Sequence, residues 1–173
     1  HFKTTKQEVE EFVAWTNAGE FDAVTPNSNT QEENFPGYSV PLSIQNWPGN
    51  YAGPDQDNYE FNLAPYVSVS GEGFYNWQEG DYPAYDLAGD SECNTEDLNQ
   101  IYGDQNLWWV FNDNGNIHTE SGSSQAIGME IRAQAFAFAT NDEVNNMTFY
   151  NYQLINRSTF TLTDTYFGFW VDS

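Results

Sequence analysis

Hydrophobic and polar residues follow a helical period only near the start of the chain. Residues 4–17 place their apolar side chains on one stripe, formed by Val9, Phe12 and Val13 with Trp15 nearby. Thr4 or Thr5 precedes the stripe as an N-cap, and Gly19 follows it as a typical helix end. The pattern predicts one short amphipathic helix.

From Phe61 onward the chain instead shows short apolar or alternating runs separated by turn residues. These runs are rich in Thr, Tyr and Phe, which suit a half-buried pleated surface. The predicted strands are residues 66–69, 107–111, 127–139, 148–156 and 160–171. Residues 112–116 contain Asn-Gly and predict a tight hairpin turn after the second of these strands.

The fold class that follows is all-β, an antiparallel β-sandwich of the Ig-like or jelly-roll-like kind with a short N-terminal helix and long ordered loops. Residues 21–58 are rich in Asn, Pro, Gly and acids, with short strands expected near residues 38–40 and 42–44. We divide the chain into an N-terminal helix and loop-rich segment, residues 1–60, and a sandwich, residues 61–173. Because the chain begins at His1 and stops in a strand-like run, we expect it to be truncated at both ends.

Charge changes this picture most. The chain of 173 residues has 26 Asp and Glu against 4 Lys and Arg, a net charge of −22. Such a surface repels phosphate backbones and anionic lipids, so we expect no nucleic-acid partner and no membrane insertion. The negative charges of this surface also repel one another unless cations screen them. Calcium is the candidate cofactor because it prefers carboxylate and carbonyl oxygens. The alternative is that the charge serves only solubility in a saline habitat. The single cysteine, Cys93, allows no internal disulfide.

One loop has the spacing of a calcium-binding loop. If Ser68 is the first ligand, then Ser70, Glu72 and Glu79 fall at positions three, five and twelve, with Gly73 at position six. Asp81 lies just beyond this spacing. Asp172 is a second candidate, near the chain end with Asp164. Serines replace two expected carboxylates, and a glycine-rich turn between strands is the alternative interpretation. The predicted metal ligands are Ser68, Ser70, Glu72, Glu79, Asp81 and Asp172.

Candidate catalytic chemistry is sparse. His118 beside Asp113 and Glu120 has the elements of a general base, but no nucleophile accompanies it, so no catalytic residue is assigned. A carboxylate pair for glycoside hydrolysis stays open among 26 acids. Trp47 and Trp77 are candidates for stacking on sugar rings. Trp108 and Trp109 are adjacent and therefore point to opposite faces of a strand.

An ordered set of motifs resembles a known group of proteins. It includes Gly80-Asp81-Tyr82-Pro83, Trp108-Trp109-Val110-Phe111-Asn112-Asp113, Ile127-Gly128-Met129-Glu130-Ile131 and Tyr166-Phe167-Gly168-Phe169-Trp170-Val171-Asp172. The pattern resembles the N-terminal region of large Bacteroidota surface proteins exported by the type IX secretion system, from about Trp47 onward. The resemblance implies an extracellular or outer-membrane-surface location and a longer parent chain. It carries no catalytic residues.

We therefore expect an extracellular structural or adhesion module of a larger type IX-secreted cell-surface protein, stabilised by cations, and not an enzyme. The expected partners are other domains of the same chain, components of the secretion system and extracellular polysaccharide. A carbohydrate-binding module and a part of a secreted polysaccharide-degrading enzyme are the two alternatives.

Overall fold

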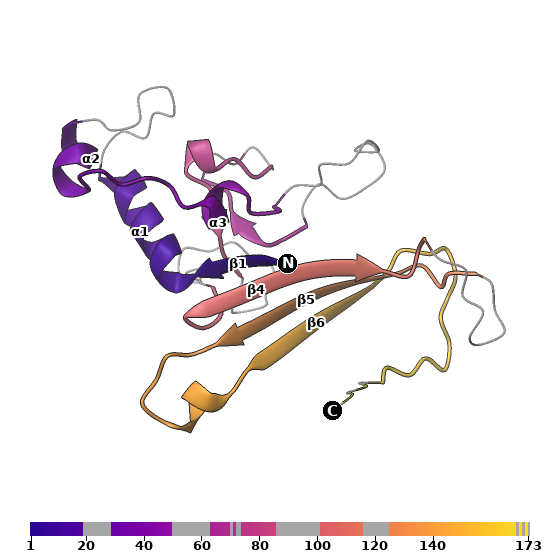
Figure 1. Ribbon diagram of the computed structural model, residues 1–173. Helices are drawn as coiled ribbons and strands as arrows, with labels where there is room; N and C mark the ends of the chain where they lie inside the picture. The colour runs from indigo at the N-terminus through magenta and orange to yellow at the C-terminus, as the bar shows by residue number, and fades with distance from the viewer. Residues whose placement is uncertain are drawn as a thin grey trace. The chain divides into compact units, whose positions relative to one another are not determined.

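The computed structural model describes residues 1–18, 29–49, 63–69, 71, 74–85, 101–115, 125–168, 170 and 172. Figure 1 traces the elements. The helices are α1 (Lys6–Asn17), α2 (Asn29–Asn34), α3 (Leu42–Gln45) and the 3₁₀ turns η2 (Trp77–Glu79) and η3 (Glu143–Asn146). The strands are β1 (Phe2–Thr5), β2 (Tyr66–Val67), β3 (Tyr82–Pro83), β4 (Gln105–Asn112), β5 (Met129–Ala137) and β6 (Phe149–Asn156).

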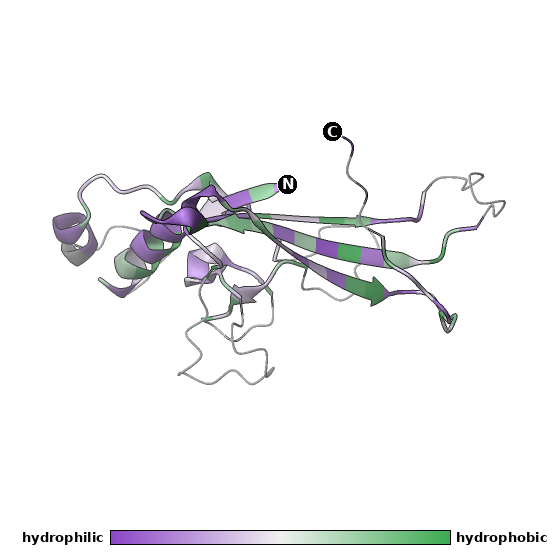
Figure 2. Cartoon of the chain, turned by 90° about the horizontal axis from the view of Figure 1, so that it is seen from below, coloured by the Kyte–Doolittle hydropathy of each residue, from purple (hydrophilic) through white to green (hydrophobic). Residues whose placement is uncertain are grey.

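The strands form two antiparallel sheets, so the fold is mostly β with a few short helices. One sheet has the order β1-β4-β5-β6 and the other pairs β2 with β3. Asp104, before β4, donates to the carbonyl of Ala137 at the end of β5. Asp113, after β4, donates to that of Met129 at the start of β5, which makes this pair antiparallel. Hydrophobic and hydrophilic residues alternate along part of the sheet, most regularly in β5, where successive side chains point to opposite faces (Figure 2).

The chain divides into two compact units. The first contains His1–Trp109 and Ala133–Tyr152, and the second contains Val110–Arg132 and Gln153–Ser173. The boundary predicted at residue 60 lies outside the described residues. Among those residues, the buried hydrophobic cluster belongs to the first unit: Val9, Phe12, Trp15, Ile44, Trp47, Ala64, Tyr75, Tyr85, Ile101 and Trp108.

Helix α1 confirms the prediction made from the apolar stripe. Thr5 accepts from the backbone N–H of Glu8, and the Glu8 carboxylate accepts from that of Thr5, which is a complete capping box. Val9, Phe12 and Trp15 are buried. The predicted helix end at Gly19 lies outside the described residues. Strand β1, Phe2–Thr5, was not predicted; it pairs with β4 and ends at Thr5, one of the two predicted N-caps.

Three long strands confirm the predicted runs, and other local predictions are wrong. Residues 42–45 form helix α3, and residues 38–40 form no strand. Strands β4 and β5 are joined by residues 113–128, and not by a two-residue turn, although Gly115 does have a positive φ of 138°. In the described part of residues 160–171 there is no strand.

Candidate functional site

The predicted calcium loop is fastened by Asp81. This side chain is fully buried, and its Oδ1 accepts from the backbone N–H of Val69 at 2.7 Å. Its Oδ2 accepts from the N–H of Asn76 at 2.9 Å. Hydrogen bonds to a charged acceptor are among the stronger ones in proteins, so Asp81 closes the loop that precedes it.

The other predicted ligands are placed only in part. Ser68 accepts from the N–H of Gly71 at 3.1 Å, and Glu79 is exposed at the end of η2. Ser70 and Glu72 lie outside the described residues. Asp172 is exposed and belongs to the second unit. The described residues contain no group of three or more His, Cys, Asp or Glu side chains suited to a metal. The calcium site therefore stays a prediction, with Asp81 already explained by its backbone contacts.

Two tyrosines lie close enough to Asp81 to respond to its charge. Burial raises the pKa of Tyr75, and the charge of Asp81 adds to this effect. The Tyr75 hydroxyl donates to the carbonyl of Ile44 at 2.6 Å. Burial and then Asp81 also raise the pKa of Tyr66. Both phenols therefore stay protonated at neutral pH, and Tyr75 serves as a buried hydrogen-bond donor.

Asp113, considered as the partner of a catalytic histidine, accepts hydrogen bonds from three backbone N–H groups. Its carboxylate accepts from the N–H groups of Ile127, Gly128 and Met129. Burial acts to raise the pKa of Asp113, but these backbone hydrogen bonds outweigh it and lower the pKa. His118 and Glu120 lie outside the described residues. Asp113 thus anchors the segment that enters β5.

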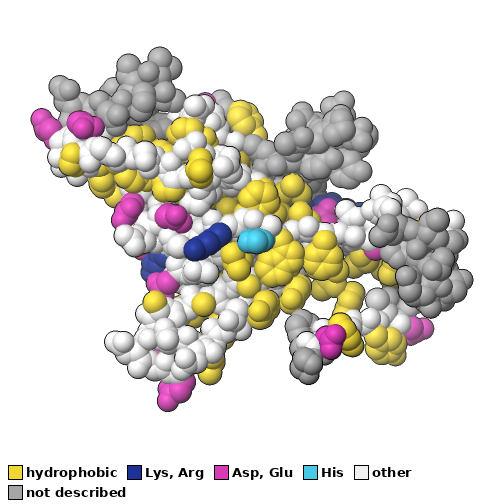
Figure 3. Space-filling view, viewed as in Figure 1, with side chains coloured by type: hydrophobic (Ala, Val, Ile, Leu, Met, Phe, Trp, Pro, Cys, Tyr) yellow, Lys and Arg dark blue, Asp and Glu magenta, His cyan; other side chains and the backbone are white. Residues whose placement is uncertain are grey.

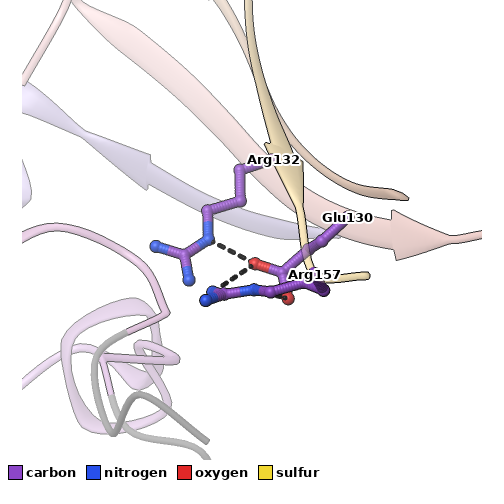
Figure 4. Close-up of polar contacts among 3 residues, drawn as sticks. All are labelled: Glu130, Arg132 and Arg157. Carbon is purple, nitrogen blue, oxygen red and sulfur yellow. Dashed lines mark hydrogen bonds and ion pairs between the residues drawn. The ribbon is translucent and has the colours of Figure 1, made fainter. Parts of the chain in front are cut away.

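Three charged residues of the second unit form a cluster that sequence reasoning missed (Figure 4). Glu130 Oε1 lies 2.8 Å from Arg132 Nε and 3.2 Å from Arg157 Nη2. Burial acts to raise the pKa of Glu130, but the hydrogen bonds from Arg157 and Arg132 outweigh it and lower the pKa. The cluster uses two of the four Lys and Arg residues of the chain. The only signal in the sequence was that Glu130 and Arg132 are two residues apart in a predicted strand and therefore lie on the same face of it.

The tryptophans proposed for sugar stacking are not both available. Trp47 is buried, and its Nε1–H donates to the carbonyl of Pro65 at 3.0 Å, so its prediction as an exposed side chain is wrong. Trp77 is partly buried and packs against the core. Trp108 is buried whereas Trp109 is half-buried, as opposite faces of one strand predict.

Large exposed side chains are found on β6 and after it. On β6, Tyr150 is 56 % and Tyr152 is 38 % exposed, and their rings lie nearly parallel at 9° with centroids 6.4 Å apart. After β6 the exposed residues are Phe160, Tyr166, Phe167 and Trp170. Hydrophobic side chains reach the surface of the molecule over much of the face in Figure 3. Among the described residues, the exposed rings that follow β6 are the strongest candidate contact site, because large exposed apolar surfaces often mark a binding partner.

Comparison with protein-family models, with curated proteins and with solved structures finds no match. In the part of the chain that the structure describes, no helix has the length and apolar character needed to cross a membrane.

Proposed function

We propose that the chain is a structural and adhesion module of a larger cell-surface protein that the type IX secretion system exports. The observation that carries the proposal is the exposed aromatic segment after β6, in which Trp170 is 82 % and Tyr166 is 90 % exposed. Aromatic residues supply much of the contact energy at interfaces. The ordered motifs shared with such exported proteins support the location. The partners are other domains of the parent chain, the secretion machinery and extracellular polysaccharide.

The module is an antiparallel β-sandwich in this proposal, Ig-like or jelly-roll-like, with the N-terminal helix packed on it. The support is the four-stranded antiparallel sheet.

Location and adhesion are tested separately. An antibody raised against this chain should label intact cells that make the protein and detect a denatured band far above 19.7 kDa.

Beads coated with the purified chain should attach to those cells or to their extracellular polysaccharide. Attachment should fall at least severalfold for the variant Tyr166→Ser/Trp170→Ser. The control is Leu42→Ser, which removes another exposed apolar side chain. A band near the mass of the chain, or attachment that the aromatic variant leaves unchanged, would overturn the proposal.

The cation-stabilised loop is part of the same proposal. Calcium should raise the melting temperature of the chain, and Glu79→Ala should abolish most of this rise. Glu143→Ala is the matched control, because Glu143 is also an exposed acid in a 3₁₀ turn. Equal calcium shifts in the two variants would exclude the loop as the binding site.

One observation favours the carbohydrate-binding alternative. The parallel rings of Tyr150 and Tyr152 are exposed on one face of β6, and flat aromatic surfaces stack on sugar rings. Tyr150→Ala and Tyr152→Ala should then each weaken retention on a polysaccharide column, whereas Phe160→Ala should not. If all three variants elute as the wild type does, these two rings bind no sugar.

A further inference from the structure

Strand β6 is the last strand of the four-stranded sheet, and its sequence does not protect this edge. It follows β5 in the sheet order, and no other described strand pairs with it. Exposed sheet edges are usually blocked by charged residues or proline. Strand β6, Phe149–Asn156, contains neither, and six of its eight residues are exposed. Within the described residues, neither the sequence of β6 nor a neighbouring strand blocks the approach of another extended chain to this edge.

The sequence of β6 is symmetric in character about Tyr152. Asn151 and Gln153 flank the centre as a pair of amides. Tyr150 and Leu154 form the next pair, and Phe149 and Ile155 the third, and both are pairs of large apolar side chains. A contact with two-fold symmetry requires this property, because residue i of one copy meets residue j of the other and the reverse.

Other centres of symmetry match poorly. A two-fold axis at Asn151 would place Phe149 opposite Gln153, and one at Gln153 would place Asn151 opposite Ile155. Directly opposed side chains on one face of a sheet contact each other, and apolar pairs or hydrogen-bonding pairs stabilise the sheet more than an apolar side chain opposite an amide. The pattern therefore selects one register, in which the Tyr152 residues of the two copies are opposite each other.

The charge distribution points to the same strand. Two copies of a chain with a net charge of −22 repel each other over most of their surfaces. Residues 144–171 contain only one basic residue, Arg157, and one acidic residue, Asp164. The edge of β6 is therefore a place where two copies can approach without bringing carboxylates together.

We propose that a second copy of this chain docks on the outer edge of β6. The two β6 strands pair antiparallel about Tyr152 and join two four-stranded sheets into one. This inference does not depend on the proposed cell-surface function, because it concerns the purified chain alone. Long-range repulsion between the copies makes the pairing weaker at low ionic strength, where the Debye length is about 30 Å at 0.01 M, than at 1 M, where it is about 3 Å.

Sedimentation velocity of the purified chain tests the pairing. The dimer should increase with protein concentration and with added NaCl. The double variants Asn151→Lys/Gln153→Lys and Asn151→Glu/Gln153→Glu should each dimerise about tenfold more weakly or not at all, because like charges then face each other. An equimolar mixture of the two variants should form a heterodimer, since each lysine then faces a glutamate.

The matched control is Thr161→Lys/Thr163→Lys. It adds the same charge at two exposed positions that follow β6, and it should dimerise as the wild type does. Far-UV circular dichroism of each variant checks that it is folded. A wild type that is monomeric in all salts overturns the proposal. If the control variant loses the dimer, the contact lies in the segment after β6. If the mixture of the two charged variants stays monomeric, the register about Tyr152 is wrong. Either result also overturns the proposal.

Discussion

At the scale of single residues, Gly103 shows why one position before a strand admits only glycine. Its φ is +67°, and a Cβ built there would lie 2.4 Å from the carbonyl oxygen of Ala137. The neighbouring N–H of Asp104 donates to the same oxygen at 2.9 Å. The backbone of the β4 entrance can therefore reach β5 only without a side chain.

We expect Gly103→Ala to destabilise the chain strongly. Gly37 has a similar φ of +71° with no atom within 4 Å of a built Cβ, so Gly37→Ala measures the conformational cost alone, about 1–2 kcal/mol. Gly103→Ala should cost at least about 1 kcal/mol more, because a backbone atom must also move. Urea unfolding of both variants gives the comparison. Equal losses of stability would show that the close approach to Ala137 is not important.

Glu130 makes stability depend on pH in the acid range. Its folded-state pKa is lowered, so its contribution is complete above the unfolded pKa of a glutamate, about 4.3, and is lost as pH falls through the folded pKa. Glu130→Gln should therefore lower stability at pH 7 by about 1–3 kcal/mol, and the difference from the wild type should shrink below about pH 4. Denaturant midpoints between pH 3 and 7 test this. The exposed Glu143 provides the control Glu143→Gln, which should lower stability much less at pH 7. A difference that is the same at pH 3 and pH 7 would contradict the assignment.

At the scale of elements, prediction from the sequence succeeded where a segment is long and its pattern is locally determined. Helix α1 has a cap and an apolar stripe within its own residues, β4 contains an almost continuous apolar run, and β5 and β6 are long segments rich in apolar residues. Strand β1 has four residues and depends on pairing with β4, far along the chain, so no local signal identifies it. Asn-Gly at 114–115 was overinterpreted, because a residue that tolerates positive φ does not determine where the next strand begins.

The candidate site was predictable to a smaller degree. The spacing of the loop at residues 68–81 drew attention to Asp81, but spacing does not reveal that both carboxylate oxygens accept backbone N–H groups. The Glu130 cluster likewise needs Arg157, which comes close only through the register of β5 and β6. The segment at residues 160–171 has a strand-like sequence, yet the pairing that would make it a strand is not a local property.

The two hydrogen bonds by which Asp81 closes its loop can be tested directly. Asp81→Ala leaves the N–H groups of Val69 and Asn76 without this acceptor, which should cost about 1–3 kcal/mol for each that stays buried. Hydrogen exchange at these two amides should become faster, whereas amides within α1 should change little. Ser68→Ala is the matched control, because its hydroxyl accepts a single exposed hydrogen bond from Gly71. Unchanged exchange at Val69 and Asn76 would show that other contacts hold the loop.

At the scale of the whole molecule, charge is the property that every proposal must accommodate. A net charge of −22 on 173 residues opposes folding through self-repulsion, and it opposes association in the same way. Calcium binding and salt screening each reduce this repulsion, whereas pairing through an uncharged strand has to occur against it. Calcium binding, salt screening and strand pairing differ in how they depend on the kind of ion and on the protein concentration.

Screening alone makes the simplest prediction. In EDTA, and at a protein concentration low enough to avoid dimers, the melting temperature should rise steadily as NaCl increases, because the Debye length falls from about 30 Å at 0.01 M to about 3 Å at 1 M. Glu32→Gln/Glu33→Gln removes two exposed charges from α2 and should reduce this dependence on salt. Thermal melts with CaCl2 and NaCl at equal ionic strength then separate the effects, since only a binding site gives calcium an advantage that Glu79→Ala removes. A melting temperature that does not change with NaCl would mean that the negative charges are spaced too widely to destabilise the fold, and cation binding could then not be explained as relief of repulsion.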